Sequence, residues 1–319
     1  MKLLYCDRLR NFGDAMNPWL WERLLPGRFD ADAASLFIGV GTLLSDQLPA
    51  RPTKWVVGAG CGYGDAPRVD DRWRIVCVRG PLTARRLGID ASLALTDPAV
   101  LVPELWRARP RSRSGVLFMP HHMNARQADW RAIAGAAGLG YVCPEDDTQS
   151  VIRQINGAQL LVTEALHGAI VADALRVPWI AVNSSRHVLQ FKWEDWCASV
   201  GLPYAPVALP ALFDSRGGDL IGQHVRRAIK RTCASVGLWC HRWSPIRPVR
   251  SAPAEFARAQ QILAALAAGD RATLSSDATL SEVTERWLAR IERLRRDLPV
   301  QRQPARWRPA PPVVAPARH

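Results

Sequence analysis

Short β-rich runs alternate with helical patterns over the first two thirds of the 319-residue chain, and this alternation constrains the fold more than any other feature. It is typical of α/β layers built on parallel sheets. The strand candidates form two groups of four, at residues 2–6, 35–41, 54–60 and 74–80, and at 115–122, 140–144, 159–164 and 178–182. Helical patterns lie between them at 16–25, 81–88, 124–138 and 147–158. We therefore predict an α/β protein with parallel sheets.

The two groups of strands are separated by residues 103–114, a stretch rich in proline and arginine without hydrophobic periodicity. A chain of this length also favours about two domains over a single core. We predict domains at 1–108 and 109–215, a helical C-terminal extension at 216–298 and a disordered, proline-rich tail at 299–319. Helical patterns in the extension cover 218–238, 254–269 and 279–298. The last of them has an apolar stripe of Leu280, Val283, Trp287, Ile291 and Leu294.

The formal charge of +13 is concentrated toward the C-terminus. Residues from Arg216 onward hold 19 of the 42 lysines and arginines but only 8 of the 29 aspartates and glutamates, so the α/β part is nearly neutral. A nearly neutral body argues against nucleic acid as the partner. The basic end either docks on an anionic surface or is a solvated face. No run of 18 uncharged apolar residues and no signal-peptide pattern occurs, which predicts a cytoplasmic chain.

Motifs for cofactors and metals are lacking in the sequence. No GxGxxG follows the first strand and no GxxxxGK[ST] occurs, so neither NAD nor P-loop ATP use is supported. The seven cysteines include no CxxC pair and fit buried thiols better than disulfides or zinc ligands. His121 and His122 are adjacent, but no third ligand stands at metal spacing. We predict no cofactor and no metal.

Polar residues follow the first predicted strand in the segment "NFGDAMN". In open parallel sheets, ligands bind beyond the carboxyl ends of the strands. Gly13 would let the backbone approach a ligand, while Asn11, Asp14 and Asn17 would hydrogen-bond sugar hydroxyls or orient a phosphate. The alternative is helix capping, since Asp14 or Asn17 can satisfy free N–H groups ahead of Pro18.

The other strands of the first group end in glycine turns or charged residues. Gly41 and Gly60 mark narrow turns that would face one crevice. Arg79 precedes Gly80-Pro81, a combination that can build an anion site from a guanidinium and a helix start, although a surface salt bridge explains it equally well. Asp97 lies near a strand end, where an Asx-Pro turn is the alternative.

Histidines follow two strands of the second group. Of His121 and His122, at most one is expected in the cleft if the strand continues, because adjacent strand residues point to opposite faces. His167 follows a buried strand and, with Gly168, opens an apolar helix whose first N–H groups are free. We predict that His167 is functional, the alternative being a packed histidine bonded to a carbonyl. Glu164 is a reserve candidate for a catalytic acid if it is buried.

An ordered set of segments resembles a known family. The segments are "NFGDAMNPWLWERLLPG", "FIGVGTLLSD", "VVGAGCGYG", "VRGPLTARRLG", "TDPAVLV" and "EALHGAIVADALRVPWIAV", and together they cover about residues 1–200. In this order they resemble the polysaccharide pyruvyltransferases, in particular the branch that modifies bacterial exopolysaccharides such as succinoglycan. The resemblance implies two Rossmann-like domains in a GT-B-like arrangement, with a cleft between them.

The resemblance also implies an activity. Members of the family transfer pyruvate from phosphoenolpyruvate to two hydroxyls of one sugar, usually on a lipid-linked oligosaccharide, and the reaction needs no redox cofactor. His167 matches the family histidine of the "LHG" segment, a catalytic or donor-binding residue, and Arg79 resembles the arginine that meets phosphoenolpyruvate. Many relatives have arginine where this chain has Ala165, so a second anion-binding cation is either absent here or supplied by another segment.

From these residues we predict how the site would work. Arg79 and the helix start at Gly168 would hold phosphate and His167 would move a proton. Asp14, with Asn11 and Asn17, would orient the sugar. The basic C-terminal helices would leave a surface that contacts the inner membrane, near a lipid-linked acceptor. Two alternatives stay open: a GT-B nucleotide-sugar glycosyltransferase, and a non-enzymatic polysaccharide-assembly factor that docks through its basic end.

Overall fold

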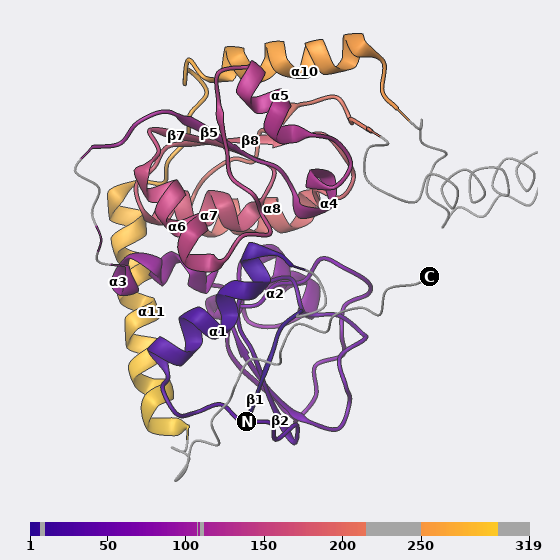
Figure 1. Ribbon diagram of the computed structural model, residues 1–319. Helices are drawn as coiled ribbons and strands as arrows, with labels where there is room; N and C mark the ends of the chain where they lie inside the picture. The colour runs from indigo at the N-terminus through magenta and orange to yellow at the C-terminus, as the bar shows by residue number, and fades with distance from the viewer. Residues whose placement is uncertain (7–9, 107, 109–111, 215–249, 299–319) are drawn as a thin grey trace, which may run out of the picture.

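The computed structural model describes residues 1–6, 10–106, 108, 112–214 and 250–298 (Figure 1). It is an α/β fold with two parallel sheets, as predicted. The first sheet has the order β1-β2-β3-β4, formed by Lys2–Leu4, Ser35–Ile38, Thr53–Val57 and Trp73–Cys77. The second has the order β6-β5-β7-β8-β9, in which β5 is Val116–Met119, β6 Gly140–Tyr141, β7 Leu160–Thr163, β8 Trp179–Asn183 and β9 Val207–Ala208. All eight predicted strands are present, and β9 is an addition.

Helices connect and cover the strands. In the first part of the chain they are α1 (Phe12–Leu24), α2 (Pro81–Leu87) and α3 (Val102–Leu105), with short 3₁₀ turns at Ala91–Leu93 and Pro98–Leu101. In the second part they are α4 (His122–Ala125), α5 (Trp130–Ala136), α6 (Thr148–Gly157), α7 (Leu166–Ala174) and α8 (Gln190–Ser199). In the α/β part of the chain a helix lies in every predicted region, although the region 124–138 is helical only at its start and in α5; α3 and α8 were not predicted.

Helix α1 begins earlier than its sequence suggests. Its N-cap is Asn11, whose side chain accepts a hydrogen bond from Gly13 N, so capping by Asp14 or Asn17 directly before Pro18 is wrong. Pro18 therefore lies inside the helix, where it has no N–H to offer the carbonyl four residues back. Asn17 Nδ2 satisfies that carbonyl instead, at 3.2 Å from Asp14 O.

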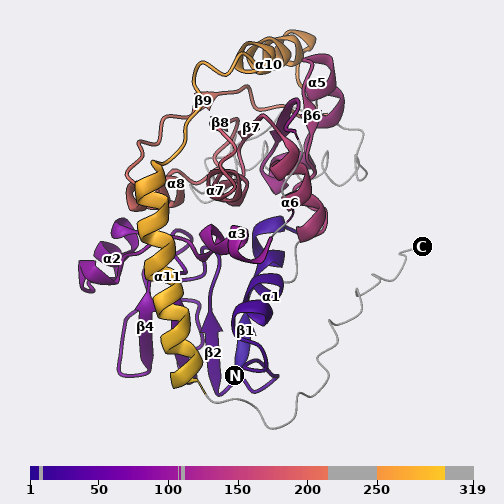
Figure 2. The ribbon, with the colours of Figure 1, turned by 90° about the vertical axis from the view of Figure 1, so that its left-hand side faces the viewer.

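The C-terminal helices pack on the α/β body. Helix α10 (Pro253–Leu266) lies beside α5 at the outer side of the second sheet, and α11 (Asp277–Asp297) runs along the flank of the molecule past the first sheet (Figures 1 and 2). Four residues of the predicted α11 stripe are buried: Val283, Trp287, Ile291 and Leu294. The Trp287 ring lies 6.4 Å from that of Trp21 in α1. The predicted helix at 218–238 and the tail at 299–319 lie outside the described residues.

One large apolar cluster contains side chains from both halves of the chain. It includes Phe12 and Phe37 of the first half, Leu161 and Ile170 of the second, and Trp287 of α11. The backbone joins the halves as well, because Phe12 N donates to Pro144 O at 2.8 Å. The sheets are therefore held in contact, and the boundary at residue 108 stays a prediction. Among the described helices, none is long and apolar enough to cross a membrane.

Candidate functional site

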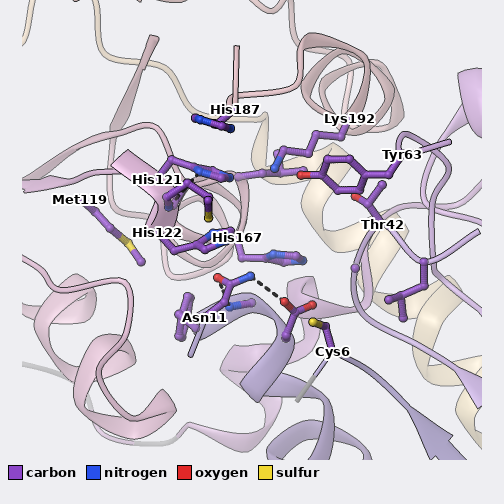
Figure 3. A pocket seen from close by; sticks show the side chains of 18 of the residues that line it. Cys6, Asn11, Thr42, Tyr63, Met119, His121, His122, His167, His187 and Lys192 are labelled. Carbon is purple, nitrogen blue, oxygen red and sulfur yellow. Dashed lines mark hydrogen bonds between the residues drawn. The ribbon is translucent and has the colours of Figure 1, made fainter. Parts of the chain in front are cut away.

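A cavity of about 470 Å³ lies where strand ends of the two sheets meet (Figure 3). Most of the residues that line it follow the carboxyl ends of β1, β2, β3, β5, β7 and β8. This is the expected place for a ligand in parallel sheets. The lining residues are Cys6, Asn11, Phe12, Gly13, Asp14, Gly41, Thr42, Leu43, Tyr63, Met119, His121, His122, Met123, Ala165, Leu166, His167, Arg186, His187 and Lys192. Seven of the predicted site residues are among them: Asn11, Gly13, Asp14, Gly41, His121, His122 and His167.

His167 faces the cavity with a carboxylate behind it. Its Nε2 lies 3.4 Å from Asp97 Oδ2, and Asp97 is fully buried at the start of the 3₁₀ turn Pro98–Leu101. Asp97 Oδ1 accepts a hydrogen bond from Ala99 N at 3.0 Å, which fixes the carboxylate. Asp97 itself does not line the cavity. Asp97 Oδ2 and His167 Nε2 are buried and make no other hydrogen bond among the described residues, so this carboxylate is placed to orient the imidazole.

Gly13 is adapted to His167. A Cβ atom on Gly13 would lie 2.1 Å from His167 Nδ1, so any other residue would displace the ring. The glycine of "NFGD" thus allows the backbone to approach an imidazole within the protein, and the two residues line the same cavity.

Asp14 and Asn11 form a polar pair at the start of α1. Asn11 Nδ2 donates to Asp14 Oδ2 at 2.8 Å. Burial raises the pKa of Asp14 above its usual 3.8, although the hydrogen bond from Asn11 and the nearby His167 and Lys192 oppose that shift. A carboxyl group with a raised pKa is suited to accept and release protons. Gly41, at φ +120°, lines the cavity close to Asp14.

Asn17 is buried away from the cavity and holds two elements together. Its side chain accepts from Val40 N and donates to Val40 O, both at 2.9 Å, and it also accepts from Trp21 Nε1. These bonds tie α1 to the end of β2, so no polar atom of Asn17 is presented to a sugar in this arrangement.

Arg79 is fully buried, and each nitrogen of its guanidinium donates to a protein group. Nε lies 3.0 Å from Asp195 Oδ2, Nη1 donates to Thr42 Oγ1 at 2.8 Å, and Nη2 donates to Cys61 O at 2.9 Å. Gly60 makes room for this group, since a Cβ there would lie 2.3 Å from Arg79 Cζ. Neither Arg79 nor Gly60 lines the cavity, but Arg79 contacts Thr42, which does.

Glu164 is also fully buried and does not line the cavity. It accepts three hydrogen bonds: from His121 N at 3.0 Å, Asn124 Nδ2 at 2.9 Å and Ser184 N at 2.7 Å. The carboxylate thus connects the exits of β5, β7 and β8. Gly168 is a packing position as well, because a Cβ there would lie 2.9 Å from Met119 Sδ.

Both His121 and His122 line the cavity, rather than one of them. Strand β5 ends at Met119 and α4 begins at His122, so the alternation of a strand no longer applies. Burial lowers the pKa of His121 to about 2 and that of His122 to about 4, with smaller contributions from the charge of Lys192. Both imidazoles are neutral at pH 7, so each has one N–H donor and one acceptor nitrogen, and His121 Nδ1 already accepts from Met123 N.

Five further polar residues line the cavity that were not predicted: Thr42, Tyr63, Arg186, His187 and Lys192. A signal for Arg186 and His187 existed, because "SSRH" follows β8 directly and the ends of other strands supplied the other candidates. Lys192 lies one turn into the unpredicted helix α8. Among the described residues, no group of three or more histidines, cysteines or acids is placed to hold a metal ion.

Comparison with known proteins gives the same family as the ordered sequence motifs. The profile of the polysaccharide pyruvyl transferase family matches residues 11–186. The succinoglycan biosynthesis protein ExoV of Rhizobium meliloti (strain 1021) is 44% identical over 206 residues, which are 63% of this chain and 65% of that protein. The match thus spans less than two thirds of the relative's length, and no solved structure matches the chain. Since the family profile covers more than half of the sequence, the chain belongs to the polysaccharide pyruvyl transferase family.

Proposed function

We propose that this protein transfers pyruvate from phosphoenolpyruvate to two hydroxyls of one sugar in an exopolysaccharide repeat unit, forming a pyruvate ketal. The observation that carries the proposal is the cavity itself, in which a carboxylate-backed imidazole, His167, lines the same space as the Asn11–Asp14 pair. Family membership and the name of the succinoglycan relative support this choice of reaction. The two sheets facing one cavity support a GT-B-like pair of Rossmann-like domains.

The reaction makes defined demands on protons. The methylene carbon of phosphoenolpyruvate gains one proton and becomes the methyl group. The neighbouring carbon forms two bonds to sugar oxygens and loses its bond to the phosphate oxygen. Two hydroxyl protons are released, of which one balances the proton on carbon and the other leaves with phosphate. A site therefore needs groups that remove protons from hydroxyls and a group that delivers one to carbon.

The residues around the cavity can meet these demands. We assign His167 to proton transfer, with Asp97 stabilising the imidazolium that forms. Asp14, whose pKa is raised by burial, accepts a proton from a sugar hydroxyl. Asn11 orients the carboxylate of Asp14 through the hydrogen bond between them. Glu164 is better suited to positioning than to acid catalysis, because all three of its partners are N–H donors.

We further propose that the acceptor is lipid-linked and that the protein meets it at the inner membrane, on the cytoplasmic side. A second cavity, of about 730 Å³, lies between β4 and α11 and is lined by Trp55, Trp73, Arg74, Arg286, Arg290 and Arg293, among others. Its arginines would favour an anionic lipid surface. Replacing Arg286 and Arg293, which are exposed, by glutamine should reduce sedimentation with phosphatidylglycerol vesicles but not with phosphatidylcholine vesicles. Unchanged sedimentation of the variant would remove this part of the proposal.

The experiment that tests the reaction is acceptor-dependent phosphate release. Purified protein is incubated with phosphoenolpyruvate and an extract of lipid-linked oligosaccharides, and inorganic phosphate is measured over time. We expect release that requires both the extract and the protein. Release that is equal without the extract, or absent with it, would contradict pyruvyl transfer.

A further inference from the structure

A single lysine, Lys192, lines the cavity. It lies on α8 and is 8% exposed, and Figure 3 shows its side chain reaching into the cavity beside Tyr63. Its Nζ lies 5.9 Å from the centroid of the Tyr63 ring. The side chain is thus withdrawn from bulk water while its charged end stays accessible to a ligand.

Among the described residues, no side chain forms a salt bridge or hydrogen bond with this ammonium group; Asp14 acts on it only from a longer distance. None of the ion pairs and hydrogen bonds in the described part of the chain involves Lys192 Nζ, in contrast to the buried cations of Arg79 and Lys54. The guanidinium of Arg79 has Asp195, Thr42 and a carbonyl as partners. Lys54, the other buried lysine, donates to Ala50 O and Pro52 O at 3.1 and 2.9 Å. Because its Nζ opens on the cavity and has no salt-bridge partner in the described ranges, Lys192 is free to pair with an anion that enters the cavity.

The surroundings of Lys192 determine where an anion can lie. The titratable and charged groups around it are Asp14, Tyr63, Arg79, His121, His122, His167, Arg186, His187 and, on its own helix, Glu194 and Asp195. His121, His187 and Lys192 lie on one side of the cavity in Figure 3, and Asn11 lies on the other. Asp14, on the Asn11 side, repels an anion. The Lys192 side therefore suits a phosphate group, and the Asp14 side suits sugar hydroxyls.

The charge state of Lys192 fits this division. Burial and the charge of Arg79 lower the pKa of Lys192 to about 8, while Asp14 opposes the shift. The group is therefore mostly protonated at pH 7 but loses its charge a little above that. His121 and His122 are neutral at the same pH, so the positive charge at the cavity comes from Lys192 and from Arg186, which also lines it.

We propose that Lys192 binds the phosphate group of the donor, a phosphate monoester dianion, and that it does so in place of the fully buried Arg79. This inference rests on the proposed function, because phosphoenolpyruvate is the monoester in question. Lysine is a compact point charge that binds phosphate well, and the neutral histidines beside it can add hydrogen bonds.

The test is calorimetric titration of the full-length protein with inorganic phosphate at pH 7.5. We expect Lys192→Met to weaken phosphate binding by about tenfold or more, as for loss of a charge-assisted hydrogen bond. Lys2→Met is the matched control, since it makes the same change at an exposed position on β1, and it should bind like the wild type. A smaller loss in Lys192→Met, or no phosphate binding by the wild type, would overturn the proposal.

Two further measurements keep the result independent of folding defects. Lys192→Met should melt close to the wild type without phosphate, because Lys192 forms no salt bridge or hydrogen bond among the described residues, and a large drop in melting temperature would assign it a structural role instead. Wild-type affinity for phosphate should fall between pH 7.5 and 9.5 as Lys192 loses its proton, and the affinity of Lys192→Met should stay flat. An equally steep fall in the variant would contradict the role of Lys192.

Titration with phosphoenolpyruvate and with UDP-glucose separates this subsite from the reaction. If phosphate and phosphoenolpyruvate both bind through Lys192 and UDP-glucose does not, the subsite and the donor are both supported. If UDP-glucose binds through Lys192 and phosphoenolpyruvate does not bind, the anion subsite stands while the proposed donor and the monoester specificity are wrong.

Discussion

His167 Nε2 lies 3.4 Å from the buried carboxylate of Asp97, so this imidazole at the cavity has an anion fixed behind it. Asp97 is held by Ala99 N in the turn that follows. The pair comes from segments on different sheets, and its geometry depends on how those sheets pack. This relationship makes the role of His167 testable through a residue that does not touch the cavity.

Asp97→Asn should lower the rate of ketal formation by about 10²- to 10⁴-fold, the range of an acid–base contribution, because the neutral amide no longer stabilises a protonated His167. The variant should still bind phosphoenolpyruvate, since Asp97 does not line the cavity. Steady-state kinetics on folded protein measures both effects. Asp71→Asn, an exposed aspartate, serves as the control, and equal activity of the two variants would count against the pair.

Gly13→Ala should reduce activity by about a hundredfold, because displacement of a catalytic group by about 1 Å has an effect of this size. The added Cβ would lie 2.1 Å from His167 Nδ1. Gly135→Ala on α5 is the matched control, as its Cβ would meet nothing within 4 Å. Full activity of Gly13→Ala would show that the position of the His167 ring does not matter.

Asp14→Asn should stabilise the protein while abolishing most of its activity. Burial raises the pKa of Asp14 in the folded state, so the carboxylate disfavours folding at pH 7. This unfavourable contribution is fully present above the raised folded pKa and disappears as the pH falls toward the usual value of 3.8. Denaturant unfolding of the variant and the wild type at pH 7 and at pH 3.8 should give a larger stability difference at pH 7. A variant less stable than the wild type at pH 7 would contradict the assignment.

Arg79 and Asp195 should behave as a buried structural pair. Arg79→Met alone should lower the free energy of unfolding by about 3–5 kcal/mol, because it leaves Asp195 buried without its cation. Combining it with Asp195→Leu should recover part of that loss. Chemical denaturation of the single and double variants gives the coupling energy directly, and additive effects would mean that the two side chains act separately.

Much of the fold could be predicted from the sequence because its strands are short, buried β-rich runs bounded by glycine and proline. Helix α8 could not, since two of its five buried residues, Lys192 and Asp195, are charged and interrupt the apolar pattern. The early start of α1 could not be predicted either, because proline is typical of the first turn of a helix, whereas Pro18 lies inside α1.

The candidate site could be predicted in part, because strand exits in parallel sheets converge. Asn11, Gly13 and His167 were found in this way. Position along the chain does not say whether a side chain points into the cavity or back into the core. Arg79 and Glu164 follow strands as expected, yet both turn inward to partners more than 40 residues away. Lys192 and Ala165 line the same cavity, so Lys192 supplies a cation near the position at which many relatives have arginine. The packing of α8 brings Lys192 to the cavity, and this packing cannot be read from the sequence.

The most direct test of the account is mass spectrometry of the product formed from isotope-labelled phosphoenolpyruvate and lipid-linked oligosaccharide, with wild-type protein and with His167→Ala. We predict that the wild type yields an oligosaccharide carrying one labelled pyruvate ketal on a single sugar, and that His167→Ala yields at most about 1% of that amount in the same time. A wild-type product without the label, or equal labelling by His167→Ala, would contradict the account.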